Sequence, residues 1–331
     1  MSTMNTRNFT ARFNSPAFLG NADRNGQWRT PPFKHLLREW WRVAWVAAGG
    51  KPADWQAMRE TEGRLFGHAW LENDHDAQGR KVGGRRSLVR LRLTPWAKGQ
   101  LQSMPRTQPV SEGRNAAASH LYLGYGPVKS AKELEMAHPL DPNKDSATLA
   151  LAWPVEESGA EYLEDALVLI HAFGTVGGRA RNGWGSIALD YEGRPPALEN
   201  LAHFVKPWRD CLAQEWAHAI GEDERGPLIW TTAARGEWKA VIEDLASIRK
   251  QTNALAKQER AREIVNQPVA GKGARVPSNL RFKVCRDENG QFYGLVFHMP
   301  FSPPKVNRRQ AETLWPDIHA LLDEQLQRSA S

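Results

Sequence analysis

The 331-residue sequence has little cysteine, little tyrosine and no long apolar run. Its two cysteines, Cys211 and Cys285, lie far apart and form no CxxC pair. This argues against a disulfide framework and against a cysteine-based zinc site. The longest apolar stretch, near residues 163–173, includes charged and polar residues and is far too short to span a membrane. The first residues lack the apolar core of a secretory signal. We therefore expect a cytoplasmic protein with no membrane partner.

Tryptophan and positive charge are both abundant. There are 14 tryptophans against 5 tyrosines, and the formal net charge is +7 at pH 7. A basic balance of this kind favours a polyanionic partner such as nucleic acid. Tryptophan suits recognition surfaces as well as cores, because its ring is flat and carries a single N–H donor.

Residues 28–48 combine both features in one predicted helix, which begins at Pro31 and Pro32. At about 100° per residue, one arc of this helix is an apolar core stripe. The adjacent arc interleaves cations with aromatic rings: Lys34, Arg38, Trp41, Arg42 and Trp45. That combination suits phosphate binding together with stacking. The alternative is that the tryptophans belong to the core and the cations form a solvated rim.

A glycine-rich loop occupies residues 174–186, between a predicted helix and a predicted strand. Glycines allow close approach to the backbone, and Arg179 and Arg181 can bind phosphate through two hydrogen bonds each. The loop is not a P-loop, because Trp184 and Gly185 stand where the Lys-Ser/Thr pair belongs, and the helix precedes the loop. The alternative is a flexible hairpin that binds nothing.

The order of predicted elements indicates an α+β protein with two ferredoxin-like domains of the RRM-like type. Residues 1–195 read as a βαββαβ unit with insertions, including a short strand at 121–128. Residues 196–331 read as helical segments at about 197–220, then a strand, a long helix at about 236–264, a hairpin and a final helix. This second domain is predicted to be degenerate, because its last strand is missing or disguised.

The predicted strand at residues 87–93 has a cationic side. Leu91 and its apolar neighbours alternate with Arg90 and Arg92, which is the period of a half-exposed strand. The arginines could meet phosphates, or they could protect a sheet edge from aggregation.

These segments resemble the RAMP superfamily of CRISPR-associated proteins. The glycine loop indicates the superfamily. Four further segments, in this order, are similar to the family of RAMP subunit one of type III-B (Cmr) effector complexes: FNSPAFLGNAD at 13–23, RTPPFKHLLREWWR at 29–42, RLFGHAW at 64–70 and LYLGYGP at 121–127. The resemblance runs along residues 9–190 and weakens afterwards.

The resemblance implies a non-catalytic RNA-binding subunit without cofactor or metal. Its implied partners are the crRNA, the complementary target RNA and the other Cmr RAMP subunits, and its implied place is towards the 3′ end of the guide. The RNA-contacting residues that it implies lie in the helix and the glycine loop: Lys34, Arg38, Trp41, Arg42, Gly177, Gly178, Arg179, Arg181, Gly183 and Trp184.

Two other functions remain open from the sequence. One is a metal-dependent RAMP endoribonuclease that uses Asp23, with His35, His68 or His75 as acid–base groups. Against it, the sequence shows no positioned partners for these groups. The other is a structural adaptor that docks neighbouring subunits through its tryptophans.

Overall fold

The computed structural model describes residues 3–69, 74–75, 78–111, 117–130, 133–259, 261–265, 278–303 and 306–329. Three groups of elements follow one another along the chain. The first group is β1 Met4–Phe13, α1 Thr30–Ala47, α2 Trp55–Phe66, β2 Arg90–Thr94, α3 Ser119–Gly124, β3 Ser146–Pro154, the 3₁₀ turn η1 Ala160–Tyr162, α4 Leu163–Phe173 and β4 Ile187–Tyr191. The middle group is η2 Leu201–Phe204, β5 Val205–Pro207, α5 Trp208–Cys211, β6 Ile220–Asp223 and β7 Gly226–Pro227. The last group is β8 Ile229–Thr231, α6 Trp238–Gln258, α7 Arg262–Val265, β9 Leu280–Arg286, β10 Phe292–His298, α8 Arg308–Gln325 and β11 Gln327–Arg328.

The first group forms a ferredoxin-like unit. Its sheet has the strand order β2-β3-β1-β4, and each pair of neighbours is antiparallel. Helices α1 and α4 connect the strands in the βαββαβ order. The predicted topology of this half of the chain is therefore confirmed.

The last group is a second ferredoxin-like unit. Its strand order, β11-β8-β10-β9, repeats that of the first sheet, again with antiparallel neighbours. The strand that the sequence left missing is β11, which is only two residues long. A strand so short carries no period-2 pattern, which explains why the sequence did not reveal it.

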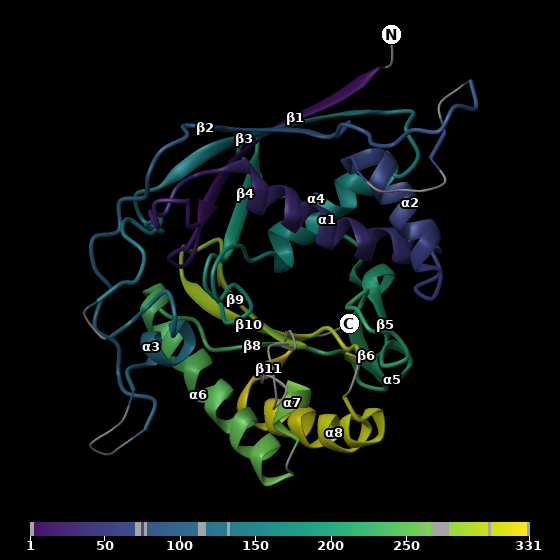
Figure 1. The fold of residues 1–331 in the computed structure, drawn as a ribbon. Helices are drawn as coiled ribbons and strands as arrows, with labels where there is room; N and C mark the ends of the chain where they lie inside the picture. Colours follow the sequence, from purple (N-terminus) through teal and green to yellow (C-terminus); the bar gives the residue numbers. More distant parts are fainter. Residues whose placement is uncertain are drawn as a thin grey trace.

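The two units stack in four layers, as Figure 1 shows. The first sheet lies at the top, α1 and α4 lie beneath it, the second sheet follows, and α6 and α8 cover the far side. Trp40 of α1 stacks on Phe173 of α4 and also meets Phe297 of β10, with ring centroids 5.8 and 6.4 Å apart. One hydrophobic core thus includes the first sheet, α1, α4 and the near face of β10.

Two predicted segments have a different structure. The predicted strand at 121–128 begins as the end of helix α3, whose Leu123 is buried. A short apolar run of this kind fits either periodicity, and here the packing of α3 against α6 decides it. Residues 197–220 are not mainly helical, because they contain η2, β5 and the four-residue α5. Pro207 interrupts the predicted helix, since proline cannot donate the backbone hydrogen bond that a helix interior requires.

The linking segment builds a small sheet of its own, in the order β5-β6-β7. The predicted domain boundary at residue 195 precedes this sheet and stays a prediction. Across the described ranges, the structure contains no helix with the length and apolar character needed to cross a membrane.

Candidate nucleic-acid interface

Helix α1 is buried on most of its circumference, because it lies between two sheets and also meets α2. Trp41 is fully buried, and its indole Nε1 donates a 2.7 Å hydrogen bond to the carbonyl of Gly159. Its ring packs edge-on against Phe66 and Tyr162. Trp41 therefore offers no face to a base in this structure, contrary to its predicted stacking role. For Trp41, the alternative that the tryptophans of the cationic arc belong to the core is therefore correct.

The cations of that arc face helix α2. Arg38 Nε and Arg42 Nη2 lie 2.6 and 2.9 Å from the carboxylate of Glu62, whose side chain is only 3% exposed. The two arginine side chains remain about one-third exposed. Two guanidinium groups against one carboxylate leave a net positive charge at the surface.

Lys34, one turn before Arg38, is held by the same helix pair. Its Nζ donates a 2.8 Å hydrogen bond to the carbonyl of Phe66 at the end of α2. Burial lowers the pKa of Lys34, and the neighbouring charge of Arg38 lowers it further. Lys34, Arg38 and Arg42 therefore all link α1 to α2.

The glycine loop joins the two ferredoxin-like units. The Phe282 backbone N–H donates to the carbonyl of Arg181, so the loop extends the edge of β9. The Asn182 side chain donates to the Leu123 carbonyl and accepts from the buried Arg249. These contacts hold the loop in one defined conformation, unlike the flexible hairpin of the alternative.

Close packing accounts for three of the loop's predicted residues. Gly177 and Gly183 have φ of 101° and 88°, in the region that favours glycine. A Cβ on Gly177 would lie 2.8 Å from the Phe18 carbonyl oxygen. Trp184 is fully buried and meets Phe18 and Trp238, so it is a core residue and not the predicted RNA contact.

Gly178 and Arg179 lie beside the loop that follows α3. The Gly178 N–H donates to the Phe18 carbonyl, so it is not available to an anion. Arg179 is exposed, and its Nε donates a 2.6 Å hydrogen bond to the carbonyl of Tyr125. Tyr125 is 68% exposed, so this corner offers an arginine and an aromatic ring to solvent.

Glu39 of α1 connects the helix to the glycine loop and to the second unit. Its carboxylate lies 2.7 Å from Arg281 of β9 and 3.9 Å from Arg181. Burial alone would raise the pKa of Glu39, but the charges of Arg281 and Arg181 outweigh it and hold the pKa below its usual value. Burial and the charge of Arg281 lower the pKa of Arg181 to about 10, so Arg181 remains a cation at neutral pH. This cluster could not be predicted from sequence patterns, because its members come from three distant segments.

The comparisons with known proteins give structural similarity only. No protein-family model and no curated protein matches the chain. Among solved structures, it is similar to Cmr1 from Pyrococcus furiosus in the apo form, with 16% identity, 92% of this chain and 91% of that chain covered, and a TM-score of 0.45.

It is also similar to a chain of the Type III-B Cmr-beta complex bound to cognate target RNA, with 12% identity, coverage of 96% and 100%, and a TM-score of 0.46. A second structure of that complex, with AMPPnP and single-stranded DNA, gives 11% identity, coverage of 97% and 100%, and a TM-score of 0.47. All of them are Cmr structures. The ferredoxin-like assignment itself rests on the two strand orders described above.

Asp23 and His68, two of the groups considered for catalysis, have different surroundings. Asp23 is exposed in a turn in which the Asn21 side chain accepts hydrogen bonds from the backbone N–H groups of residues 23 and 25. His68 is buried and pairs with Asp74, whose pKa the hydrogen bond from Arg85 lowers to about 2. Among the residues that the structure describes, no group of three or more His, Cys, Asp and Glu side chains has the geometry of a metal site.

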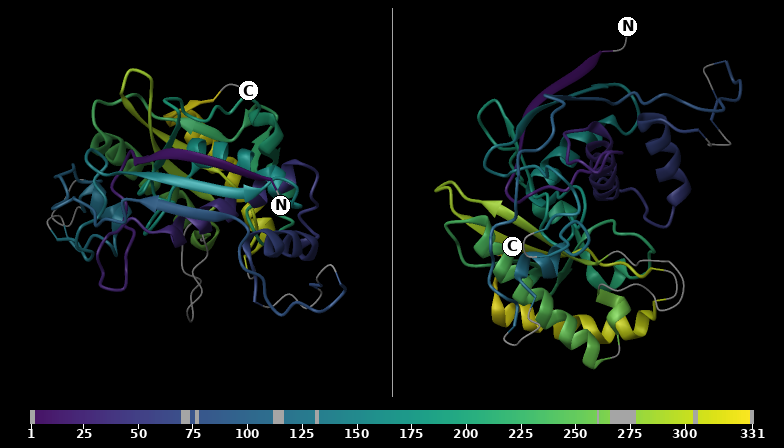
Figure 2. Two further views of the ribbon diagram at one scale, coloured as in Figure 1. Left: turned by 90° about the horizontal axis from the view of Figure 1, so that it is seen from above. Right: turned by 60° about the vertical axis from the view of Figure 1, so that its left-hand side comes forward.

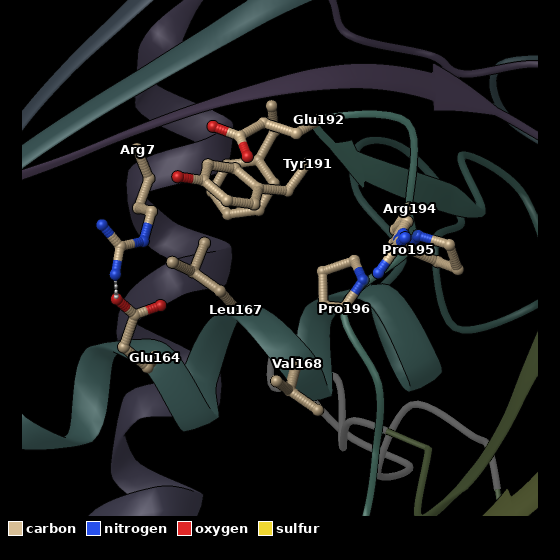
Figure 3. A pocket seen from close by; sticks show the side chains of 10 residues that line it. Arg7, Glu164, Leu167, Val168, Tyr191, Glu192, Arg194, Pro195 and Pro196 are labelled. Atoms are coloured by element: carbon tan, nitrogen blue, oxygen red, sulfur yellow. Dashed lines mark ion pairs between the residues drawn. The ribbon is translucent and has the colours of Figure 1, made fainter.

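A pocket of about 560 Å³ lies between α4 and the β1–β4 edge, as Figure 3 shows. Arg7 and Glu164 form a 2.8 Å ion pair on one side, and Tyr191, Pro195 and Pro196 lie on the other. None of the predicted RNA-binding residues lines it. Sequence reasoning also missed the exposed tryptophans, Trp55 and Trp96, which are 51% and 58% exposed.

Proposed function

We propose that this chain is a non-catalytic, RNA-binding subunit of a cytoplasmic type III-B Cmr effector complex. In this proposal it lies towards the 3′ end of the guide RNA and helps to capture complementary target RNA. The observation that carries the proposal is the glycine-rich loop between α4 and β4, packed against a second ferredoxin-like unit. The sequence resemblance implies such a loop between the last helix and the last strand of a ferredoxin-like unit.

Charge supports the same function. The net charge of +7 favours a polyanion, and a subunit that follows a changing guide has to ignore base sequence. Phosphate contacts meet that requirement, whereas hydrogen bonds to base edges do not. Arg38, Arg42 and Arg179 retain exposed guanidinium surface for such contacts.

Reconstitution with the other Cmr RAMP subunits and a crRNA tests the proposal. The chain should co-purify with them, and photo-crosslinking should join it to the 3′ part of the guide and to bound target RNA. With magnesium and labelled target RNA, the isolated chain should leave the RNA intact. Failure to join the complex would contradict the assignment. Cleavage that Asp23→Ala abolishes would instead favour the endoribonuclease.

A further inference from the structure

The two sheets share a topology, but their outer faces differ. In the second sheet, β9 and β10 are buried on both faces, because α1 and α4 of the first unit cover the side that α6 and α8 leave free. Among the described residues, the first sheet has helices on one side only. Figures 1 and 2 show its other side with no element over it.

The strand register defines the residues of this open face. In each of its four strands the alternate residues lie on the side of α1 and α4 and are buried or half-buried, and those between them point outward. The outward residues are Met4, Thr6, Asn8, Thr10 and Arg12 of β1, Arg90, Arg92 and Thr94 of β2, Ser146, Thr148, Ala150 and Ala152 of β3, and Ala188 and Asp190 of β4. We refer to this set as the open face.

Charge on the open face is almost entirely positive. Arg12, Arg90 and Arg92 are exposed, and their guanidinium groups form no hydrogen bond or ion pair within the described ranges of the chain. The one carboxylate, Asp190, accepts a hydrogen bond from the backbone N–H of Gly193. This differs from α1, where Arg38 and Arg42 share the buried Glu62.

The arginines are spaced across the face. Arg90 and Arg92 are two residues apart on one strand, which is about 7 Å. Arg12 pairs with Ser146 and Arg92 with Ala150, on either side of β3. Arg12 and Arg92 are therefore separated by two strand spacings across the sheet and by four residues along the strands. This corresponds to a distance on the order of 16 Å. A chain of several nucleotides would be needed to contact all three.

We propose that the open face binds the sugar–phosphate backbone of single-stranded RNA. The inference rests on the proposed function and names the surface that carries it. Between the arginines lie hydroxyl, amide and methyl side chains, which allow a backbone to lie flat and can hydrogen-bond to phosphate or to the ribose 2′-OH. The four strands, which are described in full, present no outward aromatic ring, so the contacts are independent of base identity.

Charge complementarity favours RNA over a protein partner on this face. A protein–protein interface has an apolar, aromatic-rich centre with few charged residues. Here the centre consists of alanine, threonine and asparagine, and the arginines lie around it. A phosphate backbone supplies the negative charge that Arg12, Arg90 and Arg92 do not meet in an ion pair within the described part of the chain.

The test is equilibrium binding of the full-length chain to a fluorescently labelled oligouridylate, measured by anisotropy over a series of salt concentrations. In the test variant, Arg12→Gln, Arg90→Gln and Arg92→Gln are combined. Its affinity at low salt should fall roughly tenfold to a hundredfold, and the slope of log K against log salt should become shallower by about 2, because each phosphate contact contributes about 0.7 for a single strand. Its melting temperature should equal that of the wild type, since all three side chains are exposed.

The matched control combines Lys206→Gln, Lys257→Gln and Arg309→Gln. It removes the same net charge from exposed positions outside the first sheet, and it should keep the wild-type salt slope. A test variant with wild-type affinity and slope overturns the open face as the RNA surface, even if the chain still binds RNA and joins the Cmr complex. A wild-type chain that neither binds the RNA nor joins the complex overturns the proposed function itself.

Discussion

Glu62 is the residue on which the surface of helix α1 depends. Its carboxylate is 3% exposed and accepts three hydrogen bonds, one from Arg38 and two from Arg42. Hydrogen bonds to a buried charge are among the stronger polar contacts in a protein. Substituting either arginine therefore weakens the fold as well as any RNA contact, which makes these two positions poor single tests of binding.

Loss of the Glu62 charge should destabilise the fold. Glu62→Gln removes the charge between two guanidinium groups, and we expect it to lower the free energy of unfolding by about 2–3 kcal/mol. Urea unfolding followed by circular dichroism measures the change. Glu60→Gln, on the same helix, is the control. Its carboxylate is 38% exposed and lies 3.7 Å from Arg64, so its loss should cost less than about 0.5 kcal/mol. Equal effects for the two variants would show that Glu62 has no special structural role.

The sequence predicted which residues of α1 lie on the second arc but not what they contact. Helical spacing places Trp41 and the cations on one stripe, and the structure confirms that these residues belong to one helix. The partners of Trp41, Arg38 and Arg42 are Gly159 and Glu62, which lie 118 and 20 to 24 residues away. Spacing within one helix carries no information about such distant partners, so a buried tryptophan and a stacking tryptophan look the same in the sequence.

Among the structural elements, the glycine loop contains the position, Gly185, with the strictest requirement for glycine. Gly185 has φ of 60°, and a Cβ there would lie 2.0 Å from the carbonyl oxygen of Val176. The Val176 N–H donates to the Gly185 carbonyl, and the Gly185 N–H donates to the carbonyl of Pro16. The glycine is required by close packing between two backbone segments, and not by a ligand.

Comparison of Gly185 with Gly193 separates close packing from backbone strain. Gly193 also has positive φ, 84°, but open space surrounds the position of its missing Cβ. Gly193→Ala should cost about 1–2 kcal/mol, which is the price of the left-handed conformation alone. Gly185→Ala should cost about 3–5 kcal/mol, since the clash adds to it. Chemical unfolding of both variants measures the difference. Similar values would mean that the loop moves aside at little cost.

Element types were predictable where the pattern was long. Helices α1, α6 and α8 and the hairpin of β9 and β10 match the predicted elements. In the turn of that hairpin, the Asp287 side chain accepts a hydrogen bond from the Gln291 N–H. Short segments were not predictable in the same way. At 121–128 and 197–220 the pattern fits more than one structure, and packing against distant elements selects the one that forms.

At the scale of the whole molecule, the two units share a core. Leu295, Phe297 and Met299 of the second unit pack with α1 and α4 of the first. The buried Lys283 of β9 donates to the carbonyl groups of Ile170 and Ile187, 3.3 and 2.8 Å away. Two repeated topologies could be read from the order of elements. Their stacking could not, because it depends on which sheet face each helix layer covers.

This shared core predicts one cooperative unfolding transition for the chain. Phe297→Ala leaves a cavity beside Trp40 and Phe173 and should lower the free energy of unfolding by about 3–5 kcal/mol. Because the cavity lies between the units, differential scanning calorimetry should show a single peak that moves to lower temperature as a whole, with equal calorimetric and van't Hoff enthalpies. Ile318→Val, in the core between α8 and the second sheet, is the milder comparison and should move the same peak by less. A peak that splits in Phe297→Ala, with one part still at the wild-type temperature, would mean that the two units unfold independently and that the contact of α1 and α4 with β10 adds little to the stability of either.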